Sequence, residues 1–193
     1  MATQPNFITV EEYLVSEERS DTRHEYWNGH MVAMAGGSPT HADIIRNLMI
    51  AIGGKLRHSG CYVRSADQRV RTNPNGLYTY PDLVISCKSE FDGTTLLNPI
   101  VLIEVLSEST EDYDRGSKFE RYSKIPSFRE YVCVAQDRVY VEHHVRDLVN
   151  PEMWTLRRLE RLSDQVTIKL PECGFIDIAI RDVYDDLELG LPQ

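Results

Sequence analysis

The run IVLIEVL at residues 100–106 constrains the fold more than any other feature of the sequence. A continuous apolar run predicts a strand covered on both faces, because half-exposed strands alternate apolar and polar side chains. Glu104 is the only charged residue in this run. A buried, ionised carboxylate is costly unless a cation, a metal ion or strong hydrogen-bond donors compensate it. Glu104 is therefore either the partner of a structural arginine or part of a functional site.

A second carboxylate, Asp82, opens the apolar segment DLVIS at residues 82–86, directly after Tyr80-Pro81. Taken alone, Asp82 is better interpreted as a turn residue after proline. Together with Glu104, it predicts two carboxylates on neighbouring strands, which is a hard oxygen site suited to Mg²⁺. An ion held there can polarise a phosphoryl oxygen and activate a water molecule.

Lys118 lies on a predicted helix at residues 111–124, which should end before Pro126 because the residue preceding a proline disfavours helical backbone. One interpretation is a solvated lysine paired with Asp114, four residues earlier. The other is a cation beside the metal ion, which would orient water or stabilise charge on a phosphate. Tyr122 could order the site together with Lys118, or it could simply pack on the sheet.

Two N-terminal elements precede these residues. Residues 8–19 predict a short amphipathic helix, with Thr9 as its cap and Glu12 at the capping-box position. Asn28-Gly29 is a favoured type I′ turn pair, so its flanking segments should form a hairpin.

The clearest predicted helix covers residues 38–56, with Pro39 and Thr40 as start signals and Gly53-Gly54 weakening its end. His41 lies on the apolar face of this helix, so its side chain should point inward. That apolar face consists of Ile44, Ile45, Leu48, Ile52 and Leu56. Strands are predicted at 61–71, 82–86, 100–106, 128–135, 138–145, 153–159 and 165–170.

Composition bounds the class of protein. A chain of 193 residues can form one domain with a substantial core, and we predict a single domain at 1–193. The net charge of −9 argues against a general attraction to nucleic acid, although residues 64–71 or 115–124 could form a local basic patch. The four cysteines are far apart in the sequence and are interpreted as reduced structural thiols. We expect a cytoplasmic protein without membrane association, because no apolar stretch could cross a bilayer and no secretory signal is evident.

These features together resemble a known group of nucleases. The order of Pro81-Asp82, Glu104 in a strand and Lys118 on the next helix resembles the PD-(D/E)XK superfamily. The segments HEYWNGHMVAMAGGSPTHADI, YPDLVI, VLIEVLSEST and DRGSKFERYSKIPSFREYV more closely resemble the Uma-two endonuclease family, and they occur in that family's order. The resemblance implies a restriction-endonuclease-like α/β fold with a mixed central β-sheet flanked by helices, an added N-terminal hairpin and added C-terminal strands.

The resemblance also implies roles for individual residues. Asp82 and Glu104 would be metal ligands, with the carbonyl of Val105 as a further ligand and Mg²⁺, or Mn²⁺ as its substitute, as the ion. The superfamily's Glu-x-Lys motif is broken by Leu106. Lys118 would then supply the lysine, as it does in the family's own pattern.

Three accessory residues carry two interpretations each. The family places a histidine at the start of the helix, so His41 would be a ligand, an acid or a phosphate donor, and otherwise a core or capping histidine. Glu25 is interpreted as a hairpin residue, with a family-type acidic role as the alternative. Tyr122 likewise either orders the site together with Lys118 or packs on the sheet.

The implied activity is hydrolysis of DNA phosphodiesters, assisted by Mg²⁺ and carried by Asp82, Glu104 and Lys118. The alternative is an inactive nuclease-like protein that serves as a binding or dimerisation module, which the acidic balance and Leu106 favour. A homodimer or higher homo-oligomer is expected, because an acidic nuclease domain with few basic residues would gain a longer cationic groove by pairing two copies.

Overall fold

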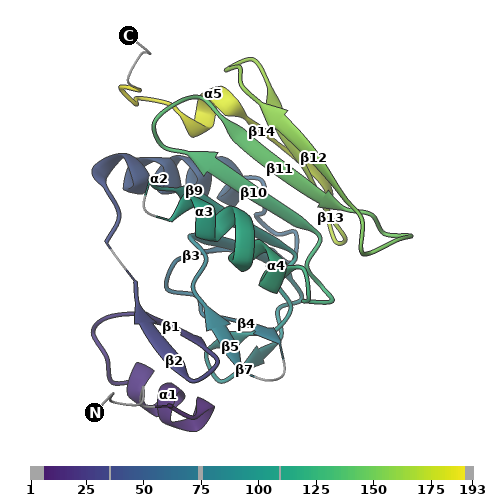
Figure 1. Ribbon diagram of the computed structural model, residues 1–193. Coiled ribbons are helices and arrows are strands. Elements are labelled where there is room, and N and C mark those ends of the chain that lie inside the picture. The colour runs from purple at the N-terminus through teal and green to yellow at the C-terminus, as the bar shows by residue number, and fades with distance from the viewer. Residues whose placement is uncertain (1–6, 35, 74–75, 109, 190–193) are drawn as a thin grey trace.

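A six-stranded mixed sheet forms the centre of the computed structural model, which describes residues 7–34, 36–73, 76–108 and 110–189 (Figure 1). Its strand order is β12-β11-β10-β9-β6-β3. The strands β9 and β10 are parallel, and the other neighbours are antiparallel. The bounds are β3 Cys61–Ser65, β6 Leu83–Cys87, β9 Val101–Leu106, β10 Glu130–Ala135, β11 Val141–Arg146 and β12 Trp154–Leu159. The predicted mixed central sheet is confirmed.

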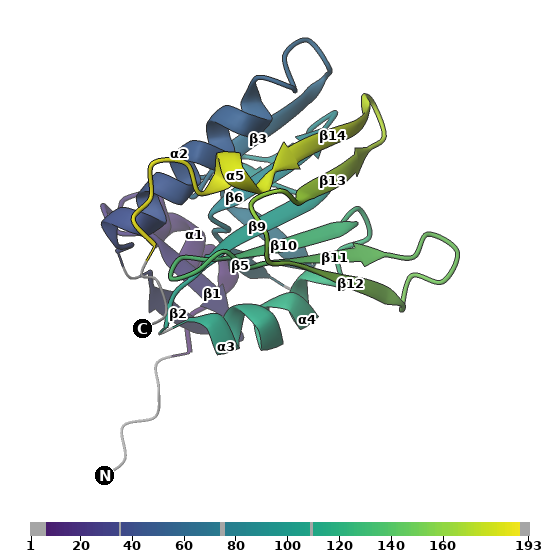
Figure 2. The ribbon, with the colours of Figure 1, turned by 90° about the horizontal axis from the view of Figure 1, so that it is seen from above.

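The central strand β9 is buried along its whole length, as its apolar run predicts. One of its faces is covered by α2 (Pro39–Gly53), by the hairpin of β13 (Gln165–Leu170) and β14 (Gly174–Ala179), and by α5 (Ile180–Val183) (Figure 2). The predicted apolar face of α2 lies against this side, with Ile44, Leu48, Ile52 and Leu56 buried.

The opposite face of the sheet is covered by the helical segment that connects β9 to β10 (Figure 2). This segment consists of α3 (Glu111–Tyr113), a π-helix η1 (Asp114–Lys118) and α4 (Phe119–Tyr122). Side chains alternate along β9, so Leu102 and Leu106 pack with Tyr122 on this side. Glu104 lies between them in the alternation and faces the same way.

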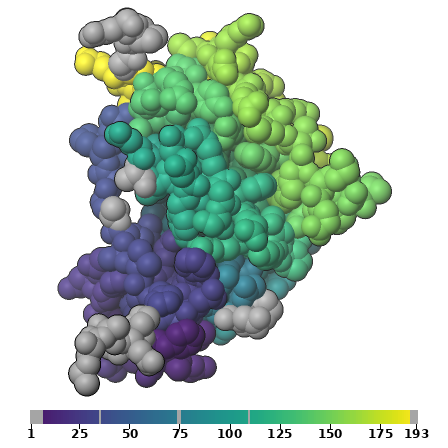
Figure 3. Space-filling model, in the orientation of Figure 1, coloured from purple at the N-terminus to yellow at the C-terminus, as the bar shows by residue number. Residues whose placement is uncertain are grey.

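A second six-stranded sheet, in the order β2-β1-β5-β4-β8-β7, lies in the N-terminal half of the chain (Figure 1). Its strands are β1 His24–Trp27, β2 His30–Ala33, β4 Val70–Asn73, β5 Leu77–Thr79, β7 Phe91–Asp92 and β8 Thr95–Leu96. The helix α1 (Val10–Glu17) packs on this sheet through a cluster of tyrosines, Tyr13, Tyr26 and Tyr78. In the space-filling view, the purple and blue N-terminal part packs against the teal and green central part (Figure 3).

Two local predictions in this region are confirmed. The capping box of α1 is formed by Thr9 and Glu12, each of which bonds the backbone of the other. The turn between β1 and β2 has positive φ at both central residues, 47° at Asn28 and 81° at Gly29, as a type I′ turn requires.

Three predictions need correction. The single strand expected at 61–71 is divided into β3 and β4, which belong to different sheets. The single helix expected at 111–124 is interrupted by the π-helix. The cysteines are not all reduced, because Cys61 and Cys87 form a disulfide. They lie opposite each other in the antiparallel pair of β3 and β6, and their separation of 26 residues in the sequence concealed that proximity.

Candidate active site

Asp82 and Glu104 meet across two neighbouring antiparallel strands. Leu83 pairs with Ile103 in the ladder of β6 and β9, which places the preceding Asp82 opposite Glu104. The backbone N–H of Asp82 donates to Glu104 Oε2 at 3.4 Å, and the N–H of Val105 donates to Asp82 Oδ2 at 2.7 Å. Asp82 and Glu104 therefore lie together on two neighbouring strands, as the sequence predicts, and both residues are buried.

Two side chains of the helical segment contact Glu104. Lys118 Nζ lies 2.9 Å from Glu104 Oε1, and the hydroxyl of Tyr122 donates to the same oxygen at 2.9 Å. The hydroxyl of Tyr122 in turn accepts a hydrogen bond from Thr79 on β5. Tyr122 thus hydrogen-bonds Glu104 and also packs on the sheet.

Lys118 is buried among three carboxylates. Besides Glu104, it contacts Asp114 Oδ1 at 3.4 Å and Glu25 Oε1 at 3.6 Å. The predicted pair with Asp114 exists, but it is buried rather than solvated. The sequence predicts Asp114 only as a solvated partner of Lys118 and not as a site residue, although the spacing of four residues places both on one helix face.

Glu25 lies on β1 of the N-terminal hairpin and contacts Lys118 from there. Its Oε2 accepts a hydrogen bond from the hydroxyl of Tyr113, and that hydroxyl accepts one from Arg121. Its Oε1 is buried and receives no hydrogen bond from the described part of the chain. That oxygen therefore depends on the charge of Lys118 for compensation.

His41 reaches the carboxylates from the first turn of α2. Its Nε2 lies 3.2 Å from Asp82 Oδ2, and its side chain is 18 % exposed. The capping residue Ser38 accepts a hydrogen bond from the backbone N–H of His41 and thereby fixes the start of the helix. The predicted inward direction of His41 is confirmed, because its partly buried side chain contacts Asp82.

The charges of the site perturb one another strongly. Burial raises the pKa of the Glu104 carboxyl well above its usual range, against the opposing effect of Lys118. Burial acts against the charge of Lys118, but the carboxylates around it, Glu104 foremost, raise its pKa well above the usual range. The hydrogen bond to Asp82 raises the pKa of His41. The surrounding carboxylates therefore favour the charged form of Lys118, and His41 binds a proton more readily than a solvated imidazole does.

These residues line a cleft of about 650 Å³ between the N-terminal hairpin, α2 and the helical segment. Its basic lining groups are Lys118 and His41. Its carboxylates are Glu25, Asp82, Glu104, Glu108 and Asp114. This excess of carboxylates favours a cation in the cleft and would repel a phosphate that approached without one.

The pair of carboxylates fits Mg²⁺ better than it fits a metal ion that needs three or more protein side chains as ligands. In the described residues, no three His, Cys, Asp or Glu side chains are grouped so that they could hold a metal ion. Mg²⁺ usually binds one or two carboxylates and keeps several waters, so the neighbouring carboxylates of Asp82 and Glu104 fit this ion.

The basic patches considered in the sequence are not free surfaces. Arg69, Lys118 and Arg121 are buried. The other four are bound to neighbouring side chains: Arg64 to Ser86, Arg71 to Asp92, Arg115 to Glu142 and Lys124 to Glu120. Neither segment forms a stripe of unpaired cations.

The fold and this arrangement of residues define a restriction-endonuclease-like protein. The chain belongs to the Uma2 family, whose model is described as "Putative restriction endonuclease" and matches residues 10–178. In the described residues, no helix is long and apolar enough to span a membrane.

Relatives and a solved structure agree with this assignment. The chain is 34 % identical over 143 residues to the uncharacterized protein slr1290 of Synechocystis sp., covering 72 % of this chain and 75 % of that protein. It is 30 % identical over 156 residues to the uncharacterized protein sll1609 of the same organism, covering 79 % and 87 %. The crystal structure of "a putative nuclease belonging to DUF820" from Anabaena variabilis superimposes with a TM-score of 0.73 at 15 % identity, covering 92 % of this chain and 97 % of that one. That likeness establishes the shared fold.

Proposed function

We propose that this protein is a Mg²⁺-dependent endonuclease that hydrolyses DNA phosphodiester bonds in the cleft described above. The observation that carries the proposal is the meeting of Asp82 and Glu104 on neighbouring strands, with Lys118 Nζ 2.9 Å from Glu104 Oε1. Two carboxylates for a divalent ion and a cation for the phosphate are the parts that phosphodiester hydrolysis needs.

The carboxylates of Asp82 and Glu104 and the carbonyl of Val105 would hold the ion, for which Mn²⁺ should substitute. When bound, Mg²⁺ polarises a phosphoryl oxygen and lowers the pKa of a coordinated water. The protein fixes the ligands beforehand, because Val105 N–H holds Asp82 and the Tyr122 hydroxyl holds Glu104. Rigid ligands reduce the reorganisation that binding would otherwise require.

Lys118 and His41 supply positive charge on two sides of the carboxylates. Lys118 approaches Glu104 from the helical segment, and His41 approaches Asp82 from α2. A charged ammonium beside the reacting phosphate would orient the attacking water or stabilise the charge that grows on phosphoryl oxygens. The imidazole, whose pKa the hydrogen bond to Asp82 raises, would donate to a phosphate oxygen.

DNA is the proposed substrate because the family description names a restriction endonuclease. The net charge of −9 and the paired basic residues indicate that a single chain binds the DNA backbone weakly. A homodimer therefore forms part of the proposal, since two copies would extend the contact with the backbone. Size-exclusion chromatography with light scattering at micromolar concentration tests this part, and a monomer would contradict it.

Cleavage of supercoiled plasmid DNA tests the activity. Wild-type protein should nick or linearise the plasmid with Mg²⁺ or Mn²⁺ and should be inactive with EDTA. Glu104→Gln should be inactive under both conditions. The matched control is Glu120→Gln, which makes the same change at an exposed position on α4 paired with Lys124, and it should cleave like wild type.

The outcomes separate this proposal from an inactive nuclease-like module. Metal-dependent cleavage that persists in Glu104→Gln would place the activity elsewhere or in a contaminant. Wild-type protein that neither cleaves nor binds Mn²⁺ would favour the binding module.

A further inference from the structure

Three of the four cysteines gather at the end of β6 that lies away from the cleft. Cys61 and Cys87 form the disulfide between β3 and β6, and both are buried. Asp82 precedes the first residue of β6 and Cys87 is its last residue, so roughly 16 Å of strand separates the disulfide from the candidate active site. Chemistry at these cysteines is therefore spatially separate from the proposed nuclease activity.

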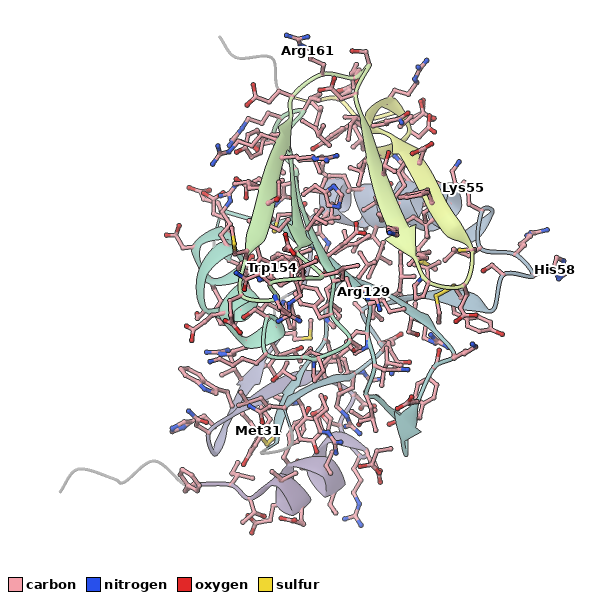
Figure 4. The ribbon with its side chains drawn as sticks, turned by 90° about the vertical axis from the view of Figure 1, so that its right-hand side faces the viewer. Met31, Lys55, His58, Arg129, Trp154 and Arg161 are labelled. Atoms are coloured by element: carbon pink, nitrogen blue, oxygen red, sulfur yellow. A yellow bond between two sulfur atoms is a disulfide. The ribbon has the colours of Figure 1, made fainter. Side chains whose placement is uncertain are left out.

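The third cysteine is a free thiol beside this disulfide. Cys173 lies in the turn between β13 and β14, and its Sγ is 4.0 Å from Cys61 Sγ. Cys173 is partly exposed, whereas the disulfide beneath it is buried. In Figure 4 the β13–β14 hairpin faces the viewer, and the disulfide is drawn as a yellow bond close to its turn.

A second contact holds the turn in this place. Lys88 follows Cys87 directly and Glu172 precedes Cys173 directly, and Lys88 Nζ lies 3.0 Å from Glu172 Oε1. Cys173 also packs against the same apolar cluster that contains Cys61 and Cys87. Two neighbouring residues of the turn thus contact the β3–β6 pair, so the thiol is held beside the disulfide.

We propose that Cys61, Cys87 and Cys173 form a thiol–disulfide exchange site. The Cys173 thiolate attacks Cys61 Sγ, a Cys61–Cys173 bond forms, the Cys61–Cys87 bond breaks, and Cys87 leaves as a thiolate that takes up the proton released from Cys173. One disulfide and one thiol stand on each side of this reaction. No oxidant or reductant is consumed.

The exchange would change which parts of the fold the disulfide links. The Cys61–Cys87 bond ties two strands of one sheet, whereas a Cys61–Cys173 bond would tie the C-terminal hairpin to the edge strand β3. Cys173 is also the most accessible of the three sulfurs, so a low-molecular-weight disulfide would enter the cluster through it.

Peptide mapping tests the proposal directly, because trypsin separates all four cysteines at intervening arginines and lysines. The protein is isolated without reductant, its free thiols are blocked with N-ethylmaleimide in the native state, and the digest is examined by mass spectrometry. Wild type should give two cross-linked products, Cys61–Cys87 and Cys61–Cys173. Cys173→Ser should give the first alone. Cys133→Ser, which changes the buried cysteine outside the cluster, should match wild type.

A second variant keeps the test decisive. Cys87→Ser removes the original partner, so oxidised glutathione should first form a mixed disulfide at Cys173, which Cys61 then displaces to give Cys61–Cys173. The proposal is overturned if wild type shows Cys61–Cys87 alone, or if glutathione stays on Cys173 in Cys87→Ser. Four free thiols in wild type after treatment with oxidised glutathione would also overturn it.

Discussion

The ammonium of Lys118 lies 2.9 Å from Glu104 Oε1 in a buried pair that also contacts Asp114 and Glu25. Replacing Lys118 with methionine would leave three carboxylates without their cation. Loss of one partner from a buried ion pair typically costs about 3–5 kcal/mol of unfolding free energy. We therefore expect Lys118→Met to unfold at lower urea concentration than wild type in EDTA, to regain part of the loss with Mn²⁺, and to cleave no DNA.

Lys124→Met is the matched control for this variant. Lys124 pairs with Glu120 on the exposed side of α4, where an ion pair contributes about 0–1 kcal/mol. Equal stability of the two methionine variants would show that Lys118 does not compensate the buried carboxylates.

Gly37 determines whether His41 can reach Asp82. A Cβ atom at Gly37 would lie 2.5 Å from His41 Nδ1, so the ring would have to move. Gly37→Ala should therefore lengthen the 3.2 Å contact between His41 Nε2 and Asp82 Oδ2 in a crystal structure of the variant. It should also lower the cleavage rate as much as His41→Ala does, with no further loss in the double variant. Gly36→Ala is the control, because a Cβ there meets no atom within 4 Å, and a loss of equal size in that control would contradict the account.

His144 should make stability depend on pH. Burial against Phe119 and Tyr131 lowers the pKa of His144 below its usual value, despite the opposing charge of Glu142. A lowered folded-state pKa means that the unfolded chain binds the proton more readily, so this contribution to stability is complete above about pH 6.5 and is lost as the pH falls through the folded-state pKa. His144→Gln should lose less unfolding free energy than wild type between pH 7.5 and 5.5 in urea denaturation. Identical losses would exclude His144 as the titrating group.

Glu104→Gln separates metal binding from folding. Gln keeps the shape of the side chain and removes the charge of a carboxyl group whose pKa is raised by burial. In EDTA, the variant should therefore melt close to wild type or slightly above it, because Lys118 keeps Asp114 and Glu25 as charged partners. Mn²⁺ should stabilise wild type alone, by about 2.7 kcal/mol when the free ion is about 100 times its Kd. A variant that melts far below wild type, with no metal effect on either protein, would make Glu104 a structural partner of Lys118.

The strands of the site were predictable because each carries a strong pattern. The apolar run around Glu104 specifies a buried strand, and Asp82 precedes another apolar segment, so their meeting required only that these strands be neighbours. Alternation along the strand then placed Glu104 on the face that the Lys118 segment covers. The inward direction of His41 followed from helical spacing alone.

Other features have no local signal of that kind. A spacing of four residues shows that Asp114 and Lys118 share a helix face, but it does not tell a buried face from a solvated one. Glu25 reaches the site through the packing of a distant hairpin, and the partner of Cys61 depends on the register of β3 against β6. The shortest strands, β7 and β8 with two residues each, are too short to show periodicity.

A crystal structure of wild-type protein grown with Mn²⁺, with diffraction recorded at the manganese absorption edge, tests the central claim most directly. Anomalous scattering locates the ion without reference to activity. The account predicts a peak in the cleft, bound by the carboxylates of Asp82 and Glu104 and by the carbonyl of Val105, and no such peak in Glu104→Gln. A peak elsewhere, or an empty cleft at millimolar Mn²⁺ with Lys118 still bound to Glu104, would contradict it.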